Sequence, residues 1–92
     1  MAIGIYFAVQ GMTPDKFDQV HARLREIGQE HPEGRTAHVG FAVGDGVQVF
    51  DVWDSPEKFE AFGAHLMPIL TELGIDPGEP VMGEVVLQVT PG

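Results

Sequence analysis

The fold is decided by residues 50–62, which read FDVWDSPEKFEAF. The first half of this stretch is rich in β-branched and aromatic residues, which favour a pleated strand. Ser55 is a typical helix N-cap, and Pro56 follows at the first helical position, where its missing N–H costs nothing. Phe59 and Phe62 then recur at the spacing of one helix face. The stretch predicts a strand that leads directly into an amphipathic helix, with both packed on one core.

Outward from this junction, turn and cap residues indicate the remaining elements. The predicted order is a strand over 2–9, a helix capped by Thr13 and stopped by Gly28, hairpin strands over 36–43 and 47–53 around Gly44-Asp45-Gly46, a helix from Ser55, and a strand over 81–90. Pro68 is expected to kink or restart the second helix, because proline removes a hydrogen bond and clashes with the preceding turn. The chain is therefore expected to be a single βαββαβ domain over residues 1–92.

Composition limits the classes of function. A chain of 92 residues has little core to spare for an internal cavity, so a pocket is expected to be shared between subunits. The formal charge of −9, with only five Lys and Arg residues, argues against nucleic acid or an anionic membrane as partner. The absence of Cys excludes thiolate catalysis and Cys-ligated metal sites. No secretory signal or membrane-spanning run is found, so a cytoplasmic location is expected.

Side chains alternate along strands, so counting in twos separates the two faces of the predicted sheet. The face expected beneath the helices carries Ile3, Ile5, Phe7, Val9, Ala37, Val39, Phe41, Val43, Phe50 and Val52. The opposite face is expected to carry Tyr6, His38, Asp51, Trp53 and Glu84. Such a partly aromatic bare face needs a cover, and a second copy related by a two-fold axis is the simplest one. Two facing sheets would enclose a barrel with polar groups inside.

The element order, the length and the sequence VWDSPEKF at residues 52–59 resemble the dimeric α+β barrel superfamily, which includes the antibiotic-biosynthesis-monooxygenase-like proteins. The resemblance implies a ferredoxin-like α+β fold, with a four-stranded antiparallel sheet, helices on one face, and a homodimer formed sheet to sheet. Members include cofactor-independent oxygenases of polycyclic aromatic substrates, haem-degrading enzymes and isomerases. The haem-degrading group has an Asn on the first strand and a Trp and a His on the second helix. This chain has no Asn, and its predicted second helix holds His65 but no Trp, which argues against haem degradation.

Cofactor-free oxygenation requires a pocket that deprotonates a phenolic substrate and stabilises the resulting anion. His38 and Asp51 are the candidate catalytic residues, because an Asp beside a His can orient the ring and raise its basicity. The candidate ligand-binding residues are Tyr6, His38, Trp53 and Glu84. Each also has a structural explanation: Trp53 can be a packing residue, His38 can be satisfied by a neighbour, and Asp51 can bind a backbone N–H.

The other histidines are expected to be structural or solvent-facing. His21 falls at the edge of the first helix's apolar stripe, His31 lies in a loop, and His65 is expected to face solvent. Their spacing is not that of a metal site, so neither a metal nor a cofactor is expected. The leading hypothesis is a homodimer that binds a small aromatic or apolar molecule in its barrel cavity, with cofactor-independent monooxygenase or isomerase activity as the enzymatic form. The alternative is a non-catalytic accessory or structural homodimer whose aromatic face serves only as an interface.

Overall fold

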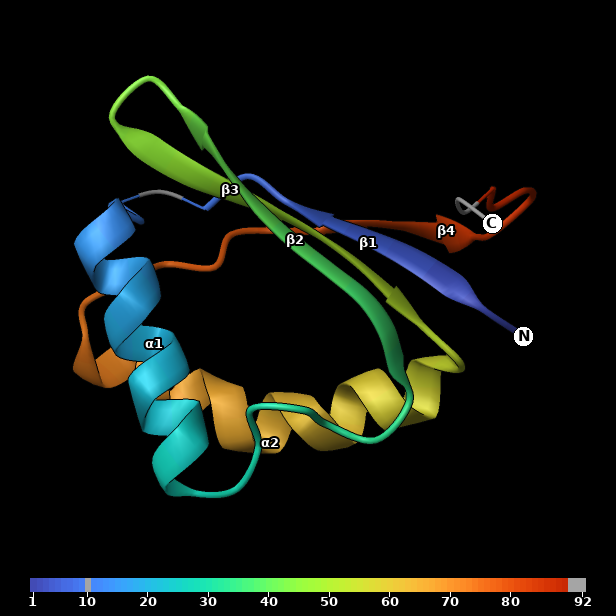
Figure 1. The fold of residues 1–92 in the computed structure, drawn as a ribbon, viewed down its shortest axis with the longest axis horizontal. Helices are drawn as coiled ribbons and strands as arrows, with labels where there is room; N and C mark the ends of the chain where they lie inside the picture. The colour runs from blue at the N-terminus through green and yellow to red at the C-terminus, as the bar shows by residue number, and fades with distance from the viewer. Residues whose placement is uncertain (10, 90–92) are drawn as a thin grey trace.

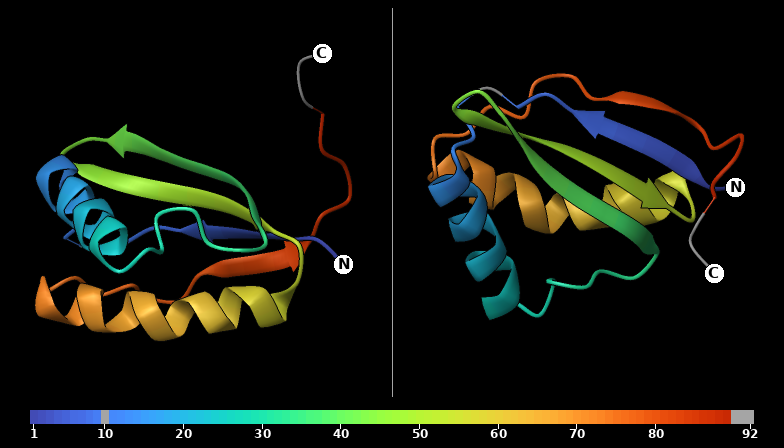
Figure 2. Two further views of the ribbon diagram at one scale, coloured as in Figure 1. Left: turned by 60° about the horizontal axis from the view of Figure 1, so that its bottom comes forward. Right: turned by 45° about the horizontal axis from the view of Figure 1, so that its top comes forward.

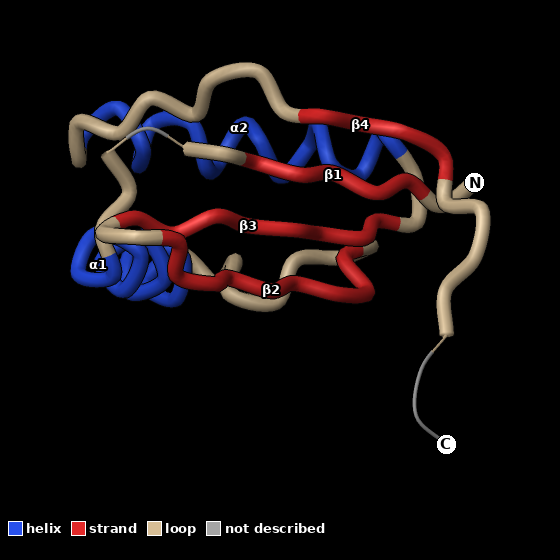
Figure 3. The backbone as a smooth tube through the Cα atoms, turned by 90° about the horizontal axis from the view of Figure 1, so that it is seen from above, coloured by secondary structure: helices blue, strands red, loops and turns tan. Residues whose placement is uncertain are grey.

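A computed structural model describes residues 1–9 and 11–89. Its elements are β1 (Ile3–Phe7), α1 (Pro14–Glu26), β2 (Arg35–Val43), β3 (Gly46–Trp53), α2 (Pro56–Glu72) and β4 (Val81–Glu84). The four strands form one antiparallel sheet in the order β2-β3-β1-β4, and both helices lie on the same side of it (Figures 1 and 3). The predicted ferredoxin-like βαββαβ fold is confirmed.

Both helices begin as the sequence predicts. The Thr13 hydroxyl accepts a hydrogen bond from the Lys16 N–H at 3.2 Å, and the Ser55 hydroxyl accepts one from the Lys58 N–H at 3.3 Å. Each cap satisfies a backbone donor that has no partner within its own helix. α2 continues through Pro68 to Glu72, so the predicted restart at Pro68 is wrong. The long α2 therefore spans the whole helical layer as one element.

The hairpin between β2 and β3 closes through the two residues Gly44 and Asp45, and its register places His38 opposite Asp51. Near the start of β2 the register shifts, because Arg35 lies opposite Trp53 while Ala37 already lies opposite the preceding residue of β3. The residue between them is therefore one extra residue on the β2 side, a β-bulge. A bulge changes the face to which the residues before it point.

The helices form a layer beneath the sheet (Figure 2), and the buried core side chains lie between the two. Its buried members include Ile3, Ile5, Val20, Leu24, Val47, Val49, Trp53, Phe62, Ile69 and Leu70. The sequence-based assignment of the β1 residues Ile3 and Ile5 to the helix side is confirmed. Fully burying one such large apolar side chain contributes about 1.5–3 kcal/mol, so this layer supplies most of the stability of the protomer.

The predicted faces of β2 and β3 are wrong. Trp53 is 0% exposed and Asp51 is 4% exposed beneath the helices, whereas Val39 and Phe50 are 52% and 40% exposed on the other face. Space explains the choice on β2, because a Cβ atom on Gly40 would lie only 2.4 Å from the Phe17 ring of α1. The helix side of β2 therefore takes a glycine and the His38 imidazole, and its larger apolar residues face outward.

The sequence predicted that Tyr6 and Glu84 would share a face with His38 and Asp51. This prediction is wrong, because Tyr6 and Glu84 lie on the outer side of the sheet. Tyr6 pairs with Phe50 on the open face, and its ring lies 6.5 Å from the Phe41 ring. Glu84 is exposed at the end of β4 and lines the same outer groove as Tyr6. The groove has a volume of about 600 Å³ and lies between the open face and the segment that follows β4.

β4 is shorter than the predicted strand over 81–90. The ladder ends at Glu84, the Val85 N–H still donates to the Ala2 carbonyl at 3.0 Å, and the segment then leaves the sheet (Figure 2). Val86 and Val89 are 96% and 81% exposed there. The predicted end of this strand at Thr90 lies outside the described residues. Within the part of the chain that the structure describes, neither helix has the length and apolar character needed to cross a membrane.

Candidate functional site

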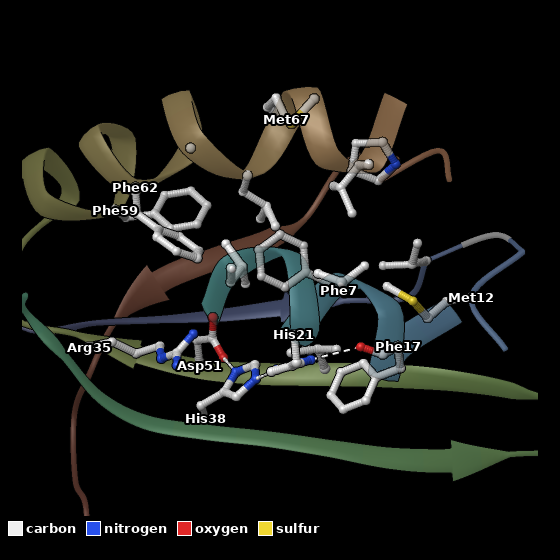
Figure 4. Close-up of a pocket in the computed structure, with 18 residues that line it drawn as sticks. Phe7, Met12, Phe17, His21, Arg35, His38, Asp51, Phe59, Phe62 and Met67 are labelled. Carbon is white, nitrogen blue, oxygen red and sulfur yellow. Dashed lines mark hydrogen bonds and ion pairs between the residues drawn. The ribbon is translucent and has the colours of Figure 1, made fainter. Parts of the chain in front are cut away.

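A small cavity lies between the sheet and the two helices (Figure 4). Its volume is about 100 Å³, and its wall is mainly apolar, with aromatic and aliphatic side chains from β1, α1, β3 and α2. Four polar side chains interrupt this wall: His21, Arg35, His38 and Asp51. A few convergent polar groups in an apolar cavity are typical of a small-molecule site. These four residues are called the polar cluster below.

Asp51 and His38 form the centre of the polar cluster. Asp51 Oδ1 and His38 Nδ1 are 2.5 Å apart, as expected from their opposite positions on the hairpin strands. The other carboxylate oxygen, Oδ2, accepts a hydrogen bond from the Trp53 indole N–H at 3.4 Å. The predicted proximity of His38 and Asp51 is therefore confirmed, and their catalytic role stays a prediction. Trp53 holds the carboxylate from behind and is absent from the cavity wall.

His21 extends the polar cluster onto α1. Its Nε2 lies 2.8 Å from His38 Nε2, and its Nδ1 lies 2.8 Å from the Phe17 carbonyl oxygen one helical turn earlier. The half-buried position agrees with the predicted edge of the apolar stripe. The sequence did not predict the contact with His38, because His38 was expected on the side of the sheet away from the helices. The signal that could have found it is the position of His21 one turn after Phe17 on the face of α1 that meets the sheet.

The hydrogen bonds and the burial of His21 together indicate one arrangement of the protons. A carbonyl oxygen only accepts, so His21 Nδ1 carries a proton and donates it to Phe17. Burial lowers the pKa of His21, and the hydrogen bond to the Phe17 carbonyl opposes this shift. The positive charges of His38 and Arg35 lower the pKa further. Since the ordinary pKa of histidine is about 6.5, His21 is neutral near pH 7. Its Nε2 is then an acceptor, and His38 Nε2 donates to it. The second His38 nitrogen shares one proton with Asp51, which leaves that pair without net charge.

Arg35 adds the remaining charge, and the β-bulge is the reason it points inward. The extra residue in β2 puts Arg35 on the same face as Trp53, where its guanidinium carbon lies 5.7 Å from the centre of the Phe62 ring. The guanidinium donates to the Glu30 carbonyl at 2.8 Å. Burial lowers the pKa of Arg35 while the charge of Asp51 opposes this, and an arginine stays protonated in either case. Strict counting in twos could not reveal Arg35, because no bulge is visible in the sequence.

The polar cluster therefore carries one net positive charge, on Arg35, in an otherwise apolar cavity. Such a cavity favours a ligand that is an anion or that becomes one, because charges interact strongly where water is excluded. Among residues 1–9 and 11–89, no group of three or more His, Asp or Glu side chains is arranged to hold a metal ion. His31 and His65 are exposed and line a separate surface cleft, in agreement with the loop position predicted for His31 and the solvent-facing position predicted for His65.

No family model matches the sequence, and no curated protein matches it. Solved structures do match. A protein from Chloroflexus aurantiacus that is provisionally named an antibiotic biosynthesis monooxygenase has a TM-score of 0.68 and 22% identity, with 100% of both chains covered. SnoaB from Streptomyces nogalater, a cofactor-independent oxygenase, has a TM-score of 0.61 and 22% identity over 99% of this chain and 96% of its own.

A third structure, from Deinococcus radiodurans and also provisionally named an antibiotic biosynthesis monooxygenase, has a TM-score of 0.60 and 10% identity over 100% of this chain and 99% of its own. At these identities the likeness establishes the architecture, over essentially the full length of every chain compared. The chain has the same ferredoxin-like α+β fold as these proteins.

Proposed function

We propose that the chain binds a small aromatic molecule with an acidic hydroxyl in the cavity beneath the helices, and that it oxygenates this molecule without a cofactor. The observation that carries the proposal is the polar cluster, which places a positive charge and two linked imidazoles in an apolar wall. The ligand site lies inside one protomer, in contrast to the shared barrel expected from sequence, because His38 and Asp51 face the helices.

The reaction begins with loss of the hydroxyl proton. The resulting phenolate or enolate is rich in electrons and reacts with dioxygen directly, while Arg35 stabilises its charge. At the ring carbon opposite the hydroxyl, the C–H bond breaks and a C=O bond forms with one oxygen atom of O₂. The second oxygen atom leaves as water with that hydrogen and the hydroxyl proton. Atoms and electrons balance, with the substrate as reductant and O₂ as oxidant.

The size of the cavity limits the ligand. A volume of about 100 Å³ is somewhat smaller than the ~150 Å³ cavity that holds benzene, so a single ring fits with little adjustment. A polycyclic ligand would require the wall to open. Met67 of α2 lines the cavity and is 46% exposed, and an unbranched, flexible methionine on the solvent side is the wall member that moves most readily.

The comparisons support the reaction class without identifying a substrate. SnoaB is described as a cofactor-independent oxygenase, and it has the fold found here. The polar cluster provides what such chemistry needs, an acceptor for a proton and a charge for the anion. Reaction class and site chemistry therefore favour the same proposal from independent directions.

Thermal unfolding with a panel of single-ring phenols and hydroquinones tests the binding. Saturating phenol should raise the unfolding temperature of the wild type by several degrees, since about 100 Kd of ligand contributes about 2.7 kcal/mol. Arg35→Gln should lose most of this shift, whereas Lys58→Gln, which removes a cation outside the cavity, should keep it. Equal shifts in both variants would contradict a site built around Arg35.

An oxygen electrode tests the reaction. Binding of the panel without any O₂ uptake would reject the oxygenase assignment.

We also propose that the open face of the sheet pairs with a second copy of the chain. This face exposes Val39, Phe41, Val43, Phe50 and Val81, and it borders the outer groove. An apolar patch of this kind on a protomer marks an interaction surface. Light scattering should give twice the chain mass of 10.0 kDa. A negative ligand panel together with a stable dimer would favour the alternative function, an accessory or structural homodimer.

A further inference from the structure

A continuous chain of hydrogen bonds crosses the polar cluster. It runs from Asp51 on β3 to His38 on β2, on to His21 on α1, and ends at the Phe17 carbonyl (Figure 4). Every step is direct, at 2.5, 2.8 and 2.8 Å. Three separate elements must be in place to form it, so the arrangement belongs to the tertiary fold. The chain has a direction, because its last acceptor is a carbonyl oxygen.

The direction identifies the group that can take up a proton. With Nδ1 committed to the Phe17 carbonyl, neutral His21 has its lone pair at Nε2. His38 is the opposite case, because it donates through Nε2 and shares a proton with Asp51 at Nδ1. His38 therefore has no lone pair directed at the cavity. The sequence alone favoured His38 as base or donor, and the hydrogen-bond chain leaves it the role of donor.

We propose that His21 is the proton acceptor of the site, and that His38, held by Asp51, donates to the ligand oxygen inserted between the two imidazole Nε2 atoms. This inference rests on the proposed function and adds the roles of the two histidines. The ligand class that it specifies is a hydroxyl compound whose oxygen both donates and accepts, which an ether or a ketone cannot do.

The proton transfer balances within the cluster. The ligand O–H bond breaks, a new N–H bond forms at His21 Nε2, and the electron pair stays on the ligand oxygen. That oxygen then accepts the His38 Nε2–H. To admit it, the two Nε2 atoms must separate from 2.8 Å to about 4.5–5 Å, the span of two hydrogen bonds to one oxygen. His21 is only half-buried, so its imidazole has room to make this movement.

The reverse assignment requires a charge in the wrong place. For His38 Nε2 to hold the lone pair, His21 would have to donate through both nitrogens and become an imidazolium. Burial, His38 and Arg35 all disfavour that charge, and they lower the pKa of His21. His38 is held in its donor role by Asp51, whose carboxylate is itself fixed by Trp53.

The first test uses the protein without a ligand. Nitrogen-15 NMR of the imidazoles distinguishes a protonated nitrogen from one with a lone pair. For His21 we expect a protonated Nδ1 and an unprotonated Nε2, and for His38 a protonated Nε2. A His38 spectrum with an unprotonated Nε2, together with a doubly protonated His21, would overturn the inference whether or not the chain is an oxygenase.

The second test follows the proton with 4-nitrophenol, whose neutral and ionised forms differ in visible absorbance. In solution acidic enough to keep the free probe neutral, binding to the wild type should produce the absorbance of the ionised form, and His21 Nε2 should change to a protonated nitrogen. His21→Gln should bind the probe but lose most of this absorbance, while His65→Gln, altered on the outside of α2, should match the wild type.

The outcomes of the probe experiment separate the two proposals. Equal ionisation of bound probe by His21→Gln and the wild type would reject His21 as acceptor while leaving the ligand site intact. A proton arriving on His38 rather than His21 would do the same. Failure of the wild type to bind the probe or any phenol of the panel would reject the proposed ligand site itself, and the roles of both histidines with it.

Discussion

At the scale of single residues, the burial of Asp51 costs free energy of folding. It is the only charged side chain that is fully buried in residues 1–9 and 11–89. An isolated buried carboxylate would cost several kcal/mol, and removing one partner from a buried pair typically costs about 3–5 kcal/mol. His38 and Trp53 offset that cost by contacting one carboxylate oxygen each. The same contacts fix the polar cluster in position before any ligand arrives.

His21 makes the stability of the protein depend on pH. The pKa of His21 is lowered in the folded state by burial, reinforced by His38 and Arg35 and opposed by the Phe17 hydrogen bond and by Glu30. Below the ordinary value of about 6.5, the unfolded chain binds a proton that the folded chain does not. The contribution is therefore fully present above about pH 6.5 and is lost as the pH falls towards the folded pKa. Urea unfolding at about pH 7.5 and about pH 5.5 should show lower stability at the acidic pH.

The matched variants isolate His21 from the carboxylates that also titrate on acidification. His21→Gln keeps a polar side chain and removes the ionisation, so its stability should fall less between the two pH values. His65→Gln, which removes an exposed histidine from α2, should behave as the wild type does. The same loss of stability in all three proteins would show that His21 does not titrate as proposed.

At the scale of elements, the sequence predicts the fold well and the site only in part. Caps at Thr13 and Ser55 and the Gly44-Asp45 turn act locally, so they locate the helices and the hairpin without tertiary information. The hairpin register also brings His38 to Asp51 from sequence alone. What could not be predicted is which face of the hairpin the helices cover, because both faces are apolar and the decision depends on the fit of Phe17 against Gly40.

Replacing Pro68 inside α2 is expected to stabilise the protein. A proline inside a helix lacks the N–H for the backbone bond and costs about 3 kcal/mol relative to alanine. Replacing it also frees the unfolded chain, which offsets about 0.4–1 kcal/mol. Pro68 is exposed, so Pro68→Ala should leave the packing of the core unchanged. We expect the free energy of unfolding to rise by about 2–2.5 kcal/mol in urea titration.

The comparison for this variant is Ala64→Gly, four residues earlier on the exposed side of α2. Glycine in an exposed helix interior should lower the free energy of unfolding by about 1 kcal/mol. A loss of stability in Pro68→Ala would mean that Pro68 contributes a packing contact that outweighs its missing hydrogen bond.

At the scale of the whole molecule, the proposed dimer depends on the open face of the sheet. We expect Val39→Glu to weaken the proposed dimer at least tenfold, or about 1.4 kcal/mol, because two like charges would be brought between facing sheets. Val39 is 52% exposed on the protomer, so the substitution should not unfold it. Sedimentation equilibrium over a range of concentrations gives the dissociation constant.

Ala64→Glu adds the same charge to the exposed side of α2 and serves as the control. Its dissociation constant should equal that of the wild type, since α2 lies on the opposite side of the molecule from the open face (Figure 1). A dimer unaffected by Val39→Glu but weakened by Ala64→Glu would place the interface on the helical layer.

The β-bulge in β2 also bears on how the molecule could diverge. Strict alternation from His38 without the bulge would place Arg35 on the outside of the sheet and leave the cavity uncharged. Ligand preference could then pass from anions to neutral compounds with every cavity side chain otherwise retained. The pairing register at the start of β2 therefore bears on the charge of the preferred ligand as directly as a substitution in the cavity wall.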